Sequence, residues 1–355
     1  MNKRILLIAI ILQAQSCFAI SPATEQAIDN IVANAMAQGN IPGLALAVMV
    51  DGKPYLKKGY GYADIEQKIP VRPGTLFGIG SVSKVITAFG LMTLVQEQKV
   101  NLDDSVLKYI PEAPRKWKTV TIRELLSHSS GIPQHYGPHL PWPKTWQQVR
   151  NLPMEFTPGT DIKYNNFGYI VLGKVIENAS GQNLDDFLAQ RIFAPLAMHK
   201  TGFPLSQAPA GLAVGYGVQN GQIVVRNNQR PWLQMWSSGG IVSTLGNMAR
   251  WDAAMTAGQL LSAESYRQMW TPVLLLNGKP AGRKNWAWSL GWQVSYQNNK
   301  LVAEKDGAIT GYSSWISRHI DDKVSIIILT NKKRTQLKRL SNQIFRQVMQ
   351  QPVVR

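Results

Sequence analysis

Strand-like segments lie near both ends of this 355-residue chain, and helical patterning fills most of the sequence between them. Near the N-terminus, apolar segments 44–50 and 54–61 flank Asp51-Gly52, a residue pair typical of a tight hairpin turn. Four further strand-like segments lie near the other end: 289–296, 301–304, 313–318 and 323–330. We therefore expect an α+β fold in which one antiparallel sheet is built from both chain ends.

Helices are expected to flank this sheet and to fill the middle of the chain. The pattern predicts a first helix over 24–37 and a last helix over 335–349, where apolar residues recur at helical spacing. Residues from about 85 to about 204 are expected to form a mostly helical lobe within one domain, 20–355. A cleft between the lobe and the sheet is the expected place for a ligand.

Residues 1–19 have the pattern of an export signal. Lys3 and Arg4 precede a short apolar run that cannot span a bilayer as a helix, and Ala19 is a small residue suited to cleavage. A lipid-modified Cys17, the single cysteine, is a weaker alternative because Gln and Ser precede it. We expect a protein exported to the periplasm or the medium, with no stable membrane insertion.

The chain is strongly basic, with a formal charge of +17 that becomes +15 without Lys3 and Arg4. Such a charge could attract nucleic acid or an anionic cell envelope. The basic residues are dispersed, however, except at 332–334 and 338–339, where they fit the solvent face of the last helix, and no nucleic-acid motif is present. We expect a monomer that binds no nucleic acid and at most contacts an anionic envelope.

The segment Ser81-Val82-Ser83-Lys84 carries the first chemical signal. It precedes the apolar run 85–95, so the hydroxyl and the amine should lie one turn apart on a buried helix. A serine becomes a nucleophile when a neighbour accepts its proton, and a desolvated lysine can do so. Ser105-x-x-Lys108 has the same spacing, but its polar, loop-like surroundings indicate an ordinary surface position.

Two further motifs follow in order. Tyr164-Asn165-Asn166 lies 83 residues after Ser81, and Lys305-Asp306-Gly307 lies 141 residues after Tyr164. The stretches 41–45, 125–133 and 237–244 support the same pattern. From about residue 25 to about 332, the chain resembles the penicillin-recognising serine hydrolases: class C β-lactamases, low-molecular-weight DD-peptidases, D-aminopeptidases and related esterases.

The resemblance implies a catalytic set. Ser81 would be the acylated nucleophile, and Lys84 would share or accept its proton. Tyr164 would act as the general base when ionised between Lys84 and Lys305, because two close cations lower the pKa of a phenol.

The resemblance also implies residues that bind the substrate. Asn166 would orient the substrate amide and Lys84. The backbone NH groups of Ser81 and Ala308 would form the oxyanion hole. Gly307 would let the substrate backbone approach its strand closely. Each motif residue also has a purely structural interpretation: Tyr164 as a packed aromatic, Lys305 as a solvated strand-end charge, Asn166 as a helix cap.

Other mechanisms fit the sequence less well. His128 could serve a Ser-His-Asp triad, but no Gly-x-Ser-x-Gly elbow exists, so we expect it to be a packing residue. His135 and His139 have a helical metal-ligand spacing, yet the neighbouring prolines disfavour a helix. We expect no metal site and no cofactor. The segment Gly137–Trp146 is expected to be an aromatic, proline-rich loop that either lines the pocket or is only rigid.

Asp306 departs from the family pattern, because β-lactamases usually carry Thr or Ser at this position to hold a substrate carboxylate. An aspartate would repel that group. The expected activity is an exported serine hydrolase of β-lactam or D-alanyl-peptide type. Asp306 favours neutral or cationic acyl substrates, so a carboxylesterase or a D-aminopeptidase is the alternative. A second hypothesis, from a different functional class, is a non-catalytic protein that binds a component of the cell envelope.

Overall fold

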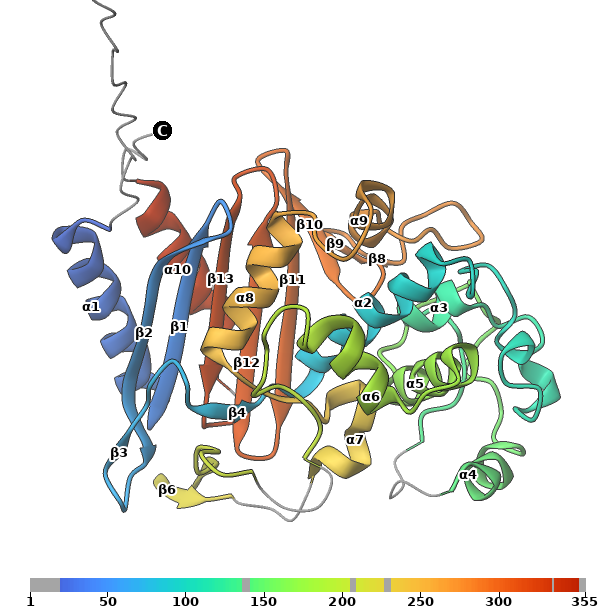
Figure 1. Ribbon diagram of the computed structural model, residues 1–355, viewed down its shortest axis with the longest axis horizontal. Helices are drawn as coiled ribbons and strands as arrows, with labels where there is room; N and C mark the ends of the chain where they lie inside the picture. Colours follow the sequence, from blue (N-terminus) through green and yellow to red (C-terminus); the bar gives the residue numbers. More distant parts are fainter. Residues whose placement is uncertain (1–19, 136–140, 205–208, 227–230, 334, 351–355) are drawn as a thin grey trace, which may run out of the picture.

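A computed structural model describes residues 20–135, 141–204, 209–226, 231–333 and 335–350. Its centre is a nine-stranded antiparallel sheet in the order β3-β2-β1-β13-β12-β11-β10-β9-β8 (Figure 1). The strands are β1 (Gly43–Val50), β2 (Lys53–Asp64), β3 (Ile69–Pro70), β8 (Gly282–Arg283), β9 (Trp286–Trp288), β10 (Gln293–Gln297), β11 (Lys300–Ile309), β12 (Tyr312–His319) and β13 (Val324–Thr330).

The two ends of the chain meet in the middle of this sheet, as predicted. Strand β1 pairs with β13 from Leu44 opposite Thr330 to Val50 opposite Val324. The expected hairpin joins β1 to β2, and both turn residues between these strands have positive φ. The predicted α+β class is therefore confirmed. The predicted export signal lies outside the described residues.

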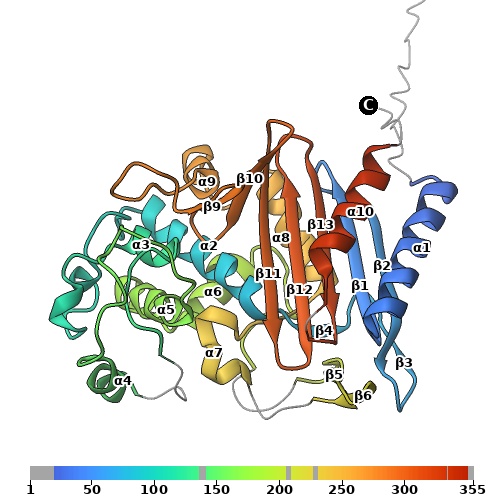
Figure 2. The same cartoon turned by 180° about the vertical axis from the view of Figure 1, so that it is seen from behind.

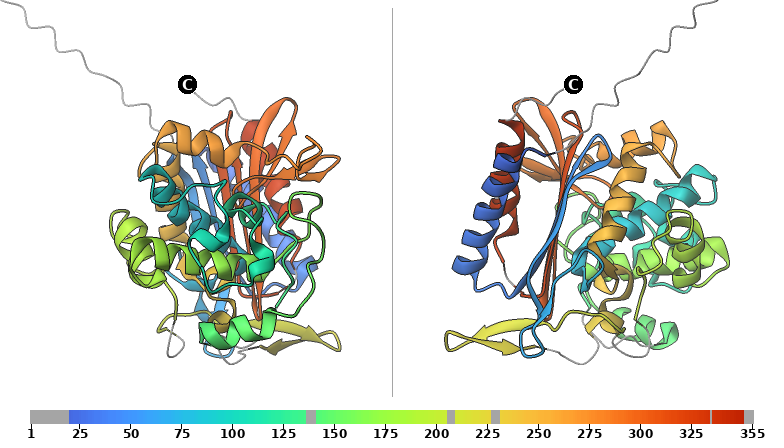
Figure 3. Two further views of the ribbon diagram at one scale, coloured as in Figure 1. Left: turned by 90° about the vertical axis from the view of Figure 1, so that its right-hand side faces the viewer. Right: turned by 60° about the vertical axis from the view of Figure 1, so that its left-hand side comes forward.

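Helices cover both faces of the sheet because its central strands are apolar on both sides. Strand β1 is buried throughout: Leu44, Leu46 and Val48 pack toward α1 (Pro22–Gly39) and α10 (Leu337–Met349). The alternate residues of β1 join the other core, against which α8 (Leu245–Thr256) packs. Figures 2 and 3 show α1 and α10 side by side on one face, opposite α8.

The helices beside the sheet surround the buried helix α2. Twelve of its fourteen residues are buried, which confirms the helix predicted after Ser81. Helix α2 spans Ser83–Gln96 and packs against α5 (Asn166–Ser180), α6 (Leu184–Leu188) and α7 (Pro231–Gly239). The other helices of this region are α3 (Ile122–Leu126), α4 (Trp142–Val149) and α9 (Ala263–Trp270). No helix among the described residues is long and apolar enough to cross a membrane.

Two local expectations were wrong. The helix α4 begins at Trp142, where an irregular loop was expected, and Trp142 stacks on Trp146 with ring centres 4.9 Å apart. Residues 137–140 of that segment lie outside the described residues. Strand β11 was expected to end at Glu304, but it continues to Ile309 because residues 305–309 pair with β12. The third motif therefore lies inside a strand.

Candidate active site

Ser81 lies in a single 3₁₀ turn, η1 (Gly80–Val82), directly before α2. Gly80 has φ +50°, and a side chain there would meet the backbone of Ala308, whose nitrogen lies 2.7 Å from the position of a Cβ. The turn can therefore lie against β11 only because this residue is a glycine. This packing brings the nucleophile candidate beside the strand that carries the third motif.

Lys84 is completely buried and binds three partners at the base of this turn. Its Nζ donates to Ser81 Oγ at 3.3 Å, to Asn166 Oδ1 at 2.8 Å and to the Ser238 carbonyl at 2.5 Å. Burial lowers the pKa of Lys84, and the nearby ammonium group of Lys305 lowers it further. A buried lysine with a lowered pKa can exchange a proton with its neighbours.

Tyr164 lies across Ser81 from α2. Its hydroxyl donates to Ser81 Oγ at 2.7 Å. Lys84 Nζ and Lys305 Nζ lie 5.0 and 5.4 Å from the ring centre. Desolvation would raise the pKa of Tyr164, but the charges of Lys305 and Lys84 outweigh it, and the pKa is lowered. With 38 % of its surface exposed, Tyr164 is also accessible from solvent.

Lys305 is buried, with 2 % of its surface exposed, so it is not the solvated strand-end charge that a structural interpretation would require. Its Nζ contacts Asp306 Oδ1 at 2.9 Å and the Asp306 carbonyl at 3.0 Å. Burial would lower the pKa of Lys305, but Tyr164 and Asp306 outweigh it and raise the pKa. Lys305 in turn lowers the pKa of the exposed Asp306. The two residues form an ion pair at the rim of the site.

In the second motif, the residue before Asn166 caps helix α5, and this cap positions Asn166. Asn165 is the N-cap, and its side chain accepts from the Gly168 amide at 3.0 Å. Asn166 is the first helical residue, and its side-chain oxygen is free to accept from Lys84. The structural interpretation of Asn166 as a cap is therefore wrong.

Gly307 is needed by the packing of the protein itself. A Cβ at this position would lie 2.1 Å from the Ile79 carbonyl oxygen and 2.2 Å from Ser314 Oγ. The side of the strand that was expected to admit the substrate backbone therefore faces η1 and β12. Ala308, on the opposite exposed face of β11, has its amide beside Gly80. The placement of Ala308 and Ser81 is compatible with the expected oxyanion hole.

Some neighbours of the site had no clear signal in the sequence. Trp288 packs 6.0 Å from the Tyr164 ring and 5.7 Å from Lys305 Nζ. The Ser238 carbonyl that binds Lys84 belongs to a stretch recognised only by its resemblance to the family. Ser105, in contrast, begins a short turn and accepts from the Leu107 amide, in keeping with the structural role expected of it.

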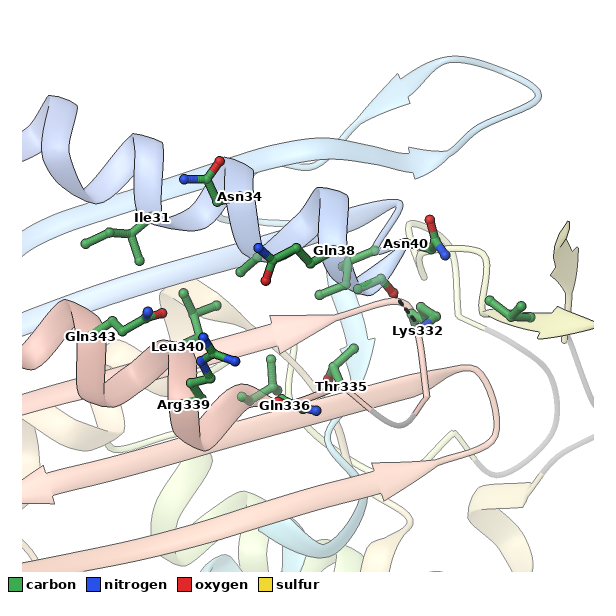
Figure 4. A pocket seen from close by; sticks show the side chains of 15 residues that line it. Ile31, Asn34, Gln38, Asn40, Lys332, Thr335, Gln336, Arg339, Leu340 and Gln343 are labelled. Carbon is green, nitrogen blue, oxygen red and sulfur yellow. Dashed lines mark hydrogen bonds between the residues drawn. The ribbon is translucent and has the colours of Figure 1, made fainter. Parts of the chain in front are cut away.

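Cavities elsewhere in the molecule are separate from this cluster. One of about 620 Å³ lies between α1 and α10 and is lined by residues that include Asn34, Gln38, Arg339 and Gln343 (Figure 4). Another of about 440 Å³ is lined by α8 and the β1–β2 hairpin. Ser81, Lys84, Tyr164 and Lys305 line neither cavity. Within the described ranges, no group of three or more His, Cys, Asp or Glu side chains is arranged to hold a metal ion.

Comparison with known proteins identifies the family. The family model Beta-lactamase matches residues 28–347, which is most of the chain. The chain belongs to the beta-lactamase family. Together with the Ser-Lys-Tyr cluster, this membership makes it a serine hydrolase, and the predicted resemblance is confirmed.

Beta-lactamase-family relatives include Protein flp of Staphylococcus aureus (strain NCTC 8325), which is 25 % identical over 341 residues, or 92 % of this chain and 67 % of the relative. Penicillin-binding protein 4* of Bacillus subtilis (strain 168) is 29 % identical over 302 residues, or 77 % of this chain and 64 % of the relative. The chain thus spans about two thirds of the length of these relatives.

Solved structures share the beta-lactamase-like fold. The octameric penicillin-binding protein homologue from Pyrococcus abyssi has a TM-score of 0.80 at 24 % identity, covering 93 % of this chain and 78 % of that one. The D-amino acid amidase from Ochrobactrum anthropi SV3 has a TM-score of 0.81 at 22 % identity, covering 92 % and 99 %. These identities support the fold alone.

Proposed function

We propose that this protein hydrolyses amide or ester bonds through an acyl-enzyme on Ser81. The observation that carries the proposal is the contact of the Tyr164 hydroxyl with Ser81 Oγ at 2.7 Å, with Lys84 Nζ 3.3 Å from the same oxygen. Ionised Tyr164 takes the Ser81 proton while Oγ bonds to the substrate carbonyl carbon. The oxyanion that forms is stabilised by the amides of Ser81 and Ala308.

The remaining steps use the same groups. Collapse of the tetrahedral intermediate breaks the bond to the leaving group, which receives the proton held by Tyr164. A water molecule then loses a proton to Tyr164 and attacks the ester carbon. The bond from this carbon to Ser81 Oγ breaks, Oγ takes the proton from Tyr164, and the acid product leaves. Lys84 and Lys305 favour the phenolate form throughout, and the bond between Lys84 and Asn166 fixes the amine.

The Asp306 carboxylate supports a preference for acyl substrates without a negative charge near the scissile bond. It is exposed on the same face of β11 as Ala308, two residues away. Its ion pair with Lys305 also reduces the positive charge that would attract a substrate carboxylate. Amides and esters of neutral or cationic groups therefore fit better than penicillins or D-alanyl peptides. One fold neighbour is a D-amino acid amidase, and another, EstCE1, is a hydrolase with promiscuous acyltransferase activity.

The proposal is tested by covalent labelling. The purified protein is treated with a fluorophosphonate probe, a fluorescent penicillin and a short activated ester, and the labelled peptide is identified by mass spectrometry. A label on Ser81 is expected from at least the fluorophosphonate. No label from any of the three would favour the non-catalytic envelope binding protein. Parallel assays of nitrocefin, a D-alanyl-D-alanine peptide, a D-amino-acid amide and a short acyl ester then rank the substrates.

Replacing Asp306 should change the ranking of these substrates. Asp306→Thr removes the repelling carboxylate and supplies a hydroxyl, so turnover of nitrocefin should rise about fivefold, since one exposed charge pair contributes up to about 1 kcal/mol. Hydrolysis of a neutral ester should change much less. Glu112→Gln, which removes an exposed carboxylate from a loop, is the matched control and should leave both rates unchanged. An unchanged nitrocefin rate in Asp306→Thr would show that this carboxylate does not select substrates.

We further propose that the protein acts after export, as a monomer in the periplasm or the medium. The N-terminal pattern of residues 1–19 supports export. Sequencing the N-terminus of the protein recovered from its host would detect cleavage after Ala19, and an uncleaved N-terminus in the cytoplasm would contradict it. The charge of +15 after cleavage suits contact with an anionic envelope.

A further inference from the structure

His128 occupies an unusual position just after α3. Its backbone has φ +59°, in the left-handed region that residues other than glycine rarely adopt. The residue is only 1 % exposed, so its ring is fixed by the surrounding protein. A buried residue in this conformation is maintained only where its surroundings require it.

His128 holds the chain on both sides of Tyr164. Its carbonyl oxygen accepts from the Lys163 amide at 2.9 Å. Its ring Nδ1 accepts from the Asn165 amide at 3.1 Å. Residues 163 and 165 are thus both tied to His128, one through its backbone and the other through its side chain. The position of the Tyr164 α-carbon follows from these two bonds.

The His128 ring also supports the phenol ring directly. The centres of the His128 and Tyr164 rings are 4.5 Å apart, at an angle of 38°. Tyr169 and Trp288 pack around His128 at 5.2 and 4.6 Å. The Tyr164 ring therefore packs against the His128 imidazole, and the Tyr164 hydroxyl contacts Ser81 Oγ.

His128 stays neutral in this environment. Burial lowers its pKa well below the usual value, and Lys84 and Lys305 lower it further. Because Nδ1 accepts a hydrogen bond, the proton of the neutral ring lies on Nε2, which has no hydrogen-bond partner among the described residues. A neutral imidazole without a bond to Ser81 is not placed to act as its base.

We propose that His128 is the positioning residue for Tyr164, holding the phenol against Ser81 and beside the two lysines. This inference rests on the proposed acyl-enzyme function and goes beyond the packing role expected from the sequence. The groups that face Tyr164 are the Ser81 hydroxyl from η1, the Lys84 ammonium from α2, the Lys305 ammonium from β11, which is paired with Asp306, and the rings of His128 and Trp288. The Tyr169 phenol lies against the His128 ring. If Tyr164 moves away from the two ammonium groups, ionisation of its phenol becomes harder.

Two substitutions separate the contributions of the bond and the ring. His128→Asn keeps an acceptor near the place of Nδ1 and tolerates positive φ, but it removes the surface that packs on Tyr164. His128→Phe keeps an aromatic ring and removes the acceptor. The matched control is His319→Asn, since His319 is also buried and also lacks a partner for Nε2 among the described residues, yet it stacks on Phe345 away from the site.

The experiment measures the second-order rate constant for labelling of Ser81 by a fluorophosphonate between pH 5 and pH 11, together with thermal unfolding of each variant. Both His128 variants should label about 10- to 100-fold more slowly at neutral pH, within the range that general-base catalysis contributes. In the wild-type pH profile, the labelling rate should rise as Tyr164 ionises, and we call this rise the acidic limb. In both His128 variants the acidic limb should lie at a pH higher by roughly one unit. His319→Asn should keep the wild-type limb.

Three results would overturn the inference. If the acidic limb stays at the wild-type pH and only the unfolding temperature falls, His128 has a structural role alone. Failure of both His128 variants to fold would lead to the same conclusion. Complete loss of the limb would mean that His128 is itself the base. Labelling of the wild-type protein at Ser81 is measured first. Its failure would reject the proposed function, whereas a normal wild type with unmoved variants would reject only the role of His128.

Discussion

Lys84→Met is expected to reduce labelling of Ser81 by a fluorophosphonate at least about a thousandfold, close to the loss in Ser81→Ala. The ammonium of Lys84 donates to Ser81 Oγ and lies 5.0 Å from the centre of the Tyr164 ring. Without it, the serine loses one proton-transfer partner and the phenolate loses one of its two stabilising cations. Both effects act on the same step, so the loss should exceed that of either contact alone.

The fold should tolerate this change. Methionine has a volume close to that of lysine, and the change removes an ammonium group whose burial costs free energy. Asn166 Oδ1 and the Ser238 carbonyl lose a donor, which limits any gain in stability. Thermal unfolding of Lys84→Met should therefore remain cooperative and near that of the wild type.

The chain provides its own control in Lys108, the lysine of the second Ser-x-x-Lys match. Lys108 is exposed and pairs with Asp104, an interaction that contributes little to stability. Lys108→Met should label like the wild type. Normal labelling of a folded Lys84→Met would show that Lys84 takes no part in proton transfer.

The central strands of the sheet could be predicted from the sequence because they are apolar runs with strong turn signals. The edge strands β3, β8 and β9 were not predicted, and β10 begins at Gln293 instead of the expected residue 289. The α1 helix, the Asp51-Gly52 hairpin and α10 were predicted to within about three residues of their ends. The predicted strand ended at Glu304 because Lys305 and Asp306 are polar, whereas β11 continues to Ile309. Pairing with β12 and burial of Lys305 override that local pattern, and neither is visible in the sequence.

The site could be predicted as a set of residues, but its supporting contacts could not. Motif order brought Ser81, Lys84 and Tyr164 together correctly, because each motif carries a recognisable spacing. The Ser238 carbonyl that binds Lys84 and the amides of Lys163 and Asn165 that bind His128 are main-chain groups, which every residue type possesses. Gly307 was given a substrate role, although Ile79 packs against it. Contacts made by main-chain atoms do not depend on residue type, so they cannot be predicted from the sequence and are seen only in the fold.

Tyr164→Phe is expected to lower the rate of Ser81 labelling at neutral pH about 100- to 10,000-fold, the range attributed to a positioned general base. The change removes the one hydroxyl that contacts Ser81 Oγ at 2.7 Å, while the ring can keep its packing on His128. Lys84 would remain as a poorer substitute, since it lies 3.3 Å from the same oxygen. The fold should be unaffected.

The pH profile tests this role more sharply than the rate does. Because the lysines lower the pKa of Tyr164, the reactive phenolate forms as the pH rises through a value below 10, and wild-type labelling should rise over that interval. Tyr164→Phe has no phenol to ionise and should lose this limb. Tyr266→Phe, which removes a phenol bonded to the Gln259 carbonyl away from the site, should retain it. If the limb persists in Tyr164→Phe, another group is the base, and Lys84, the other side chain bonded to Ser81 Oγ, becomes the first candidate.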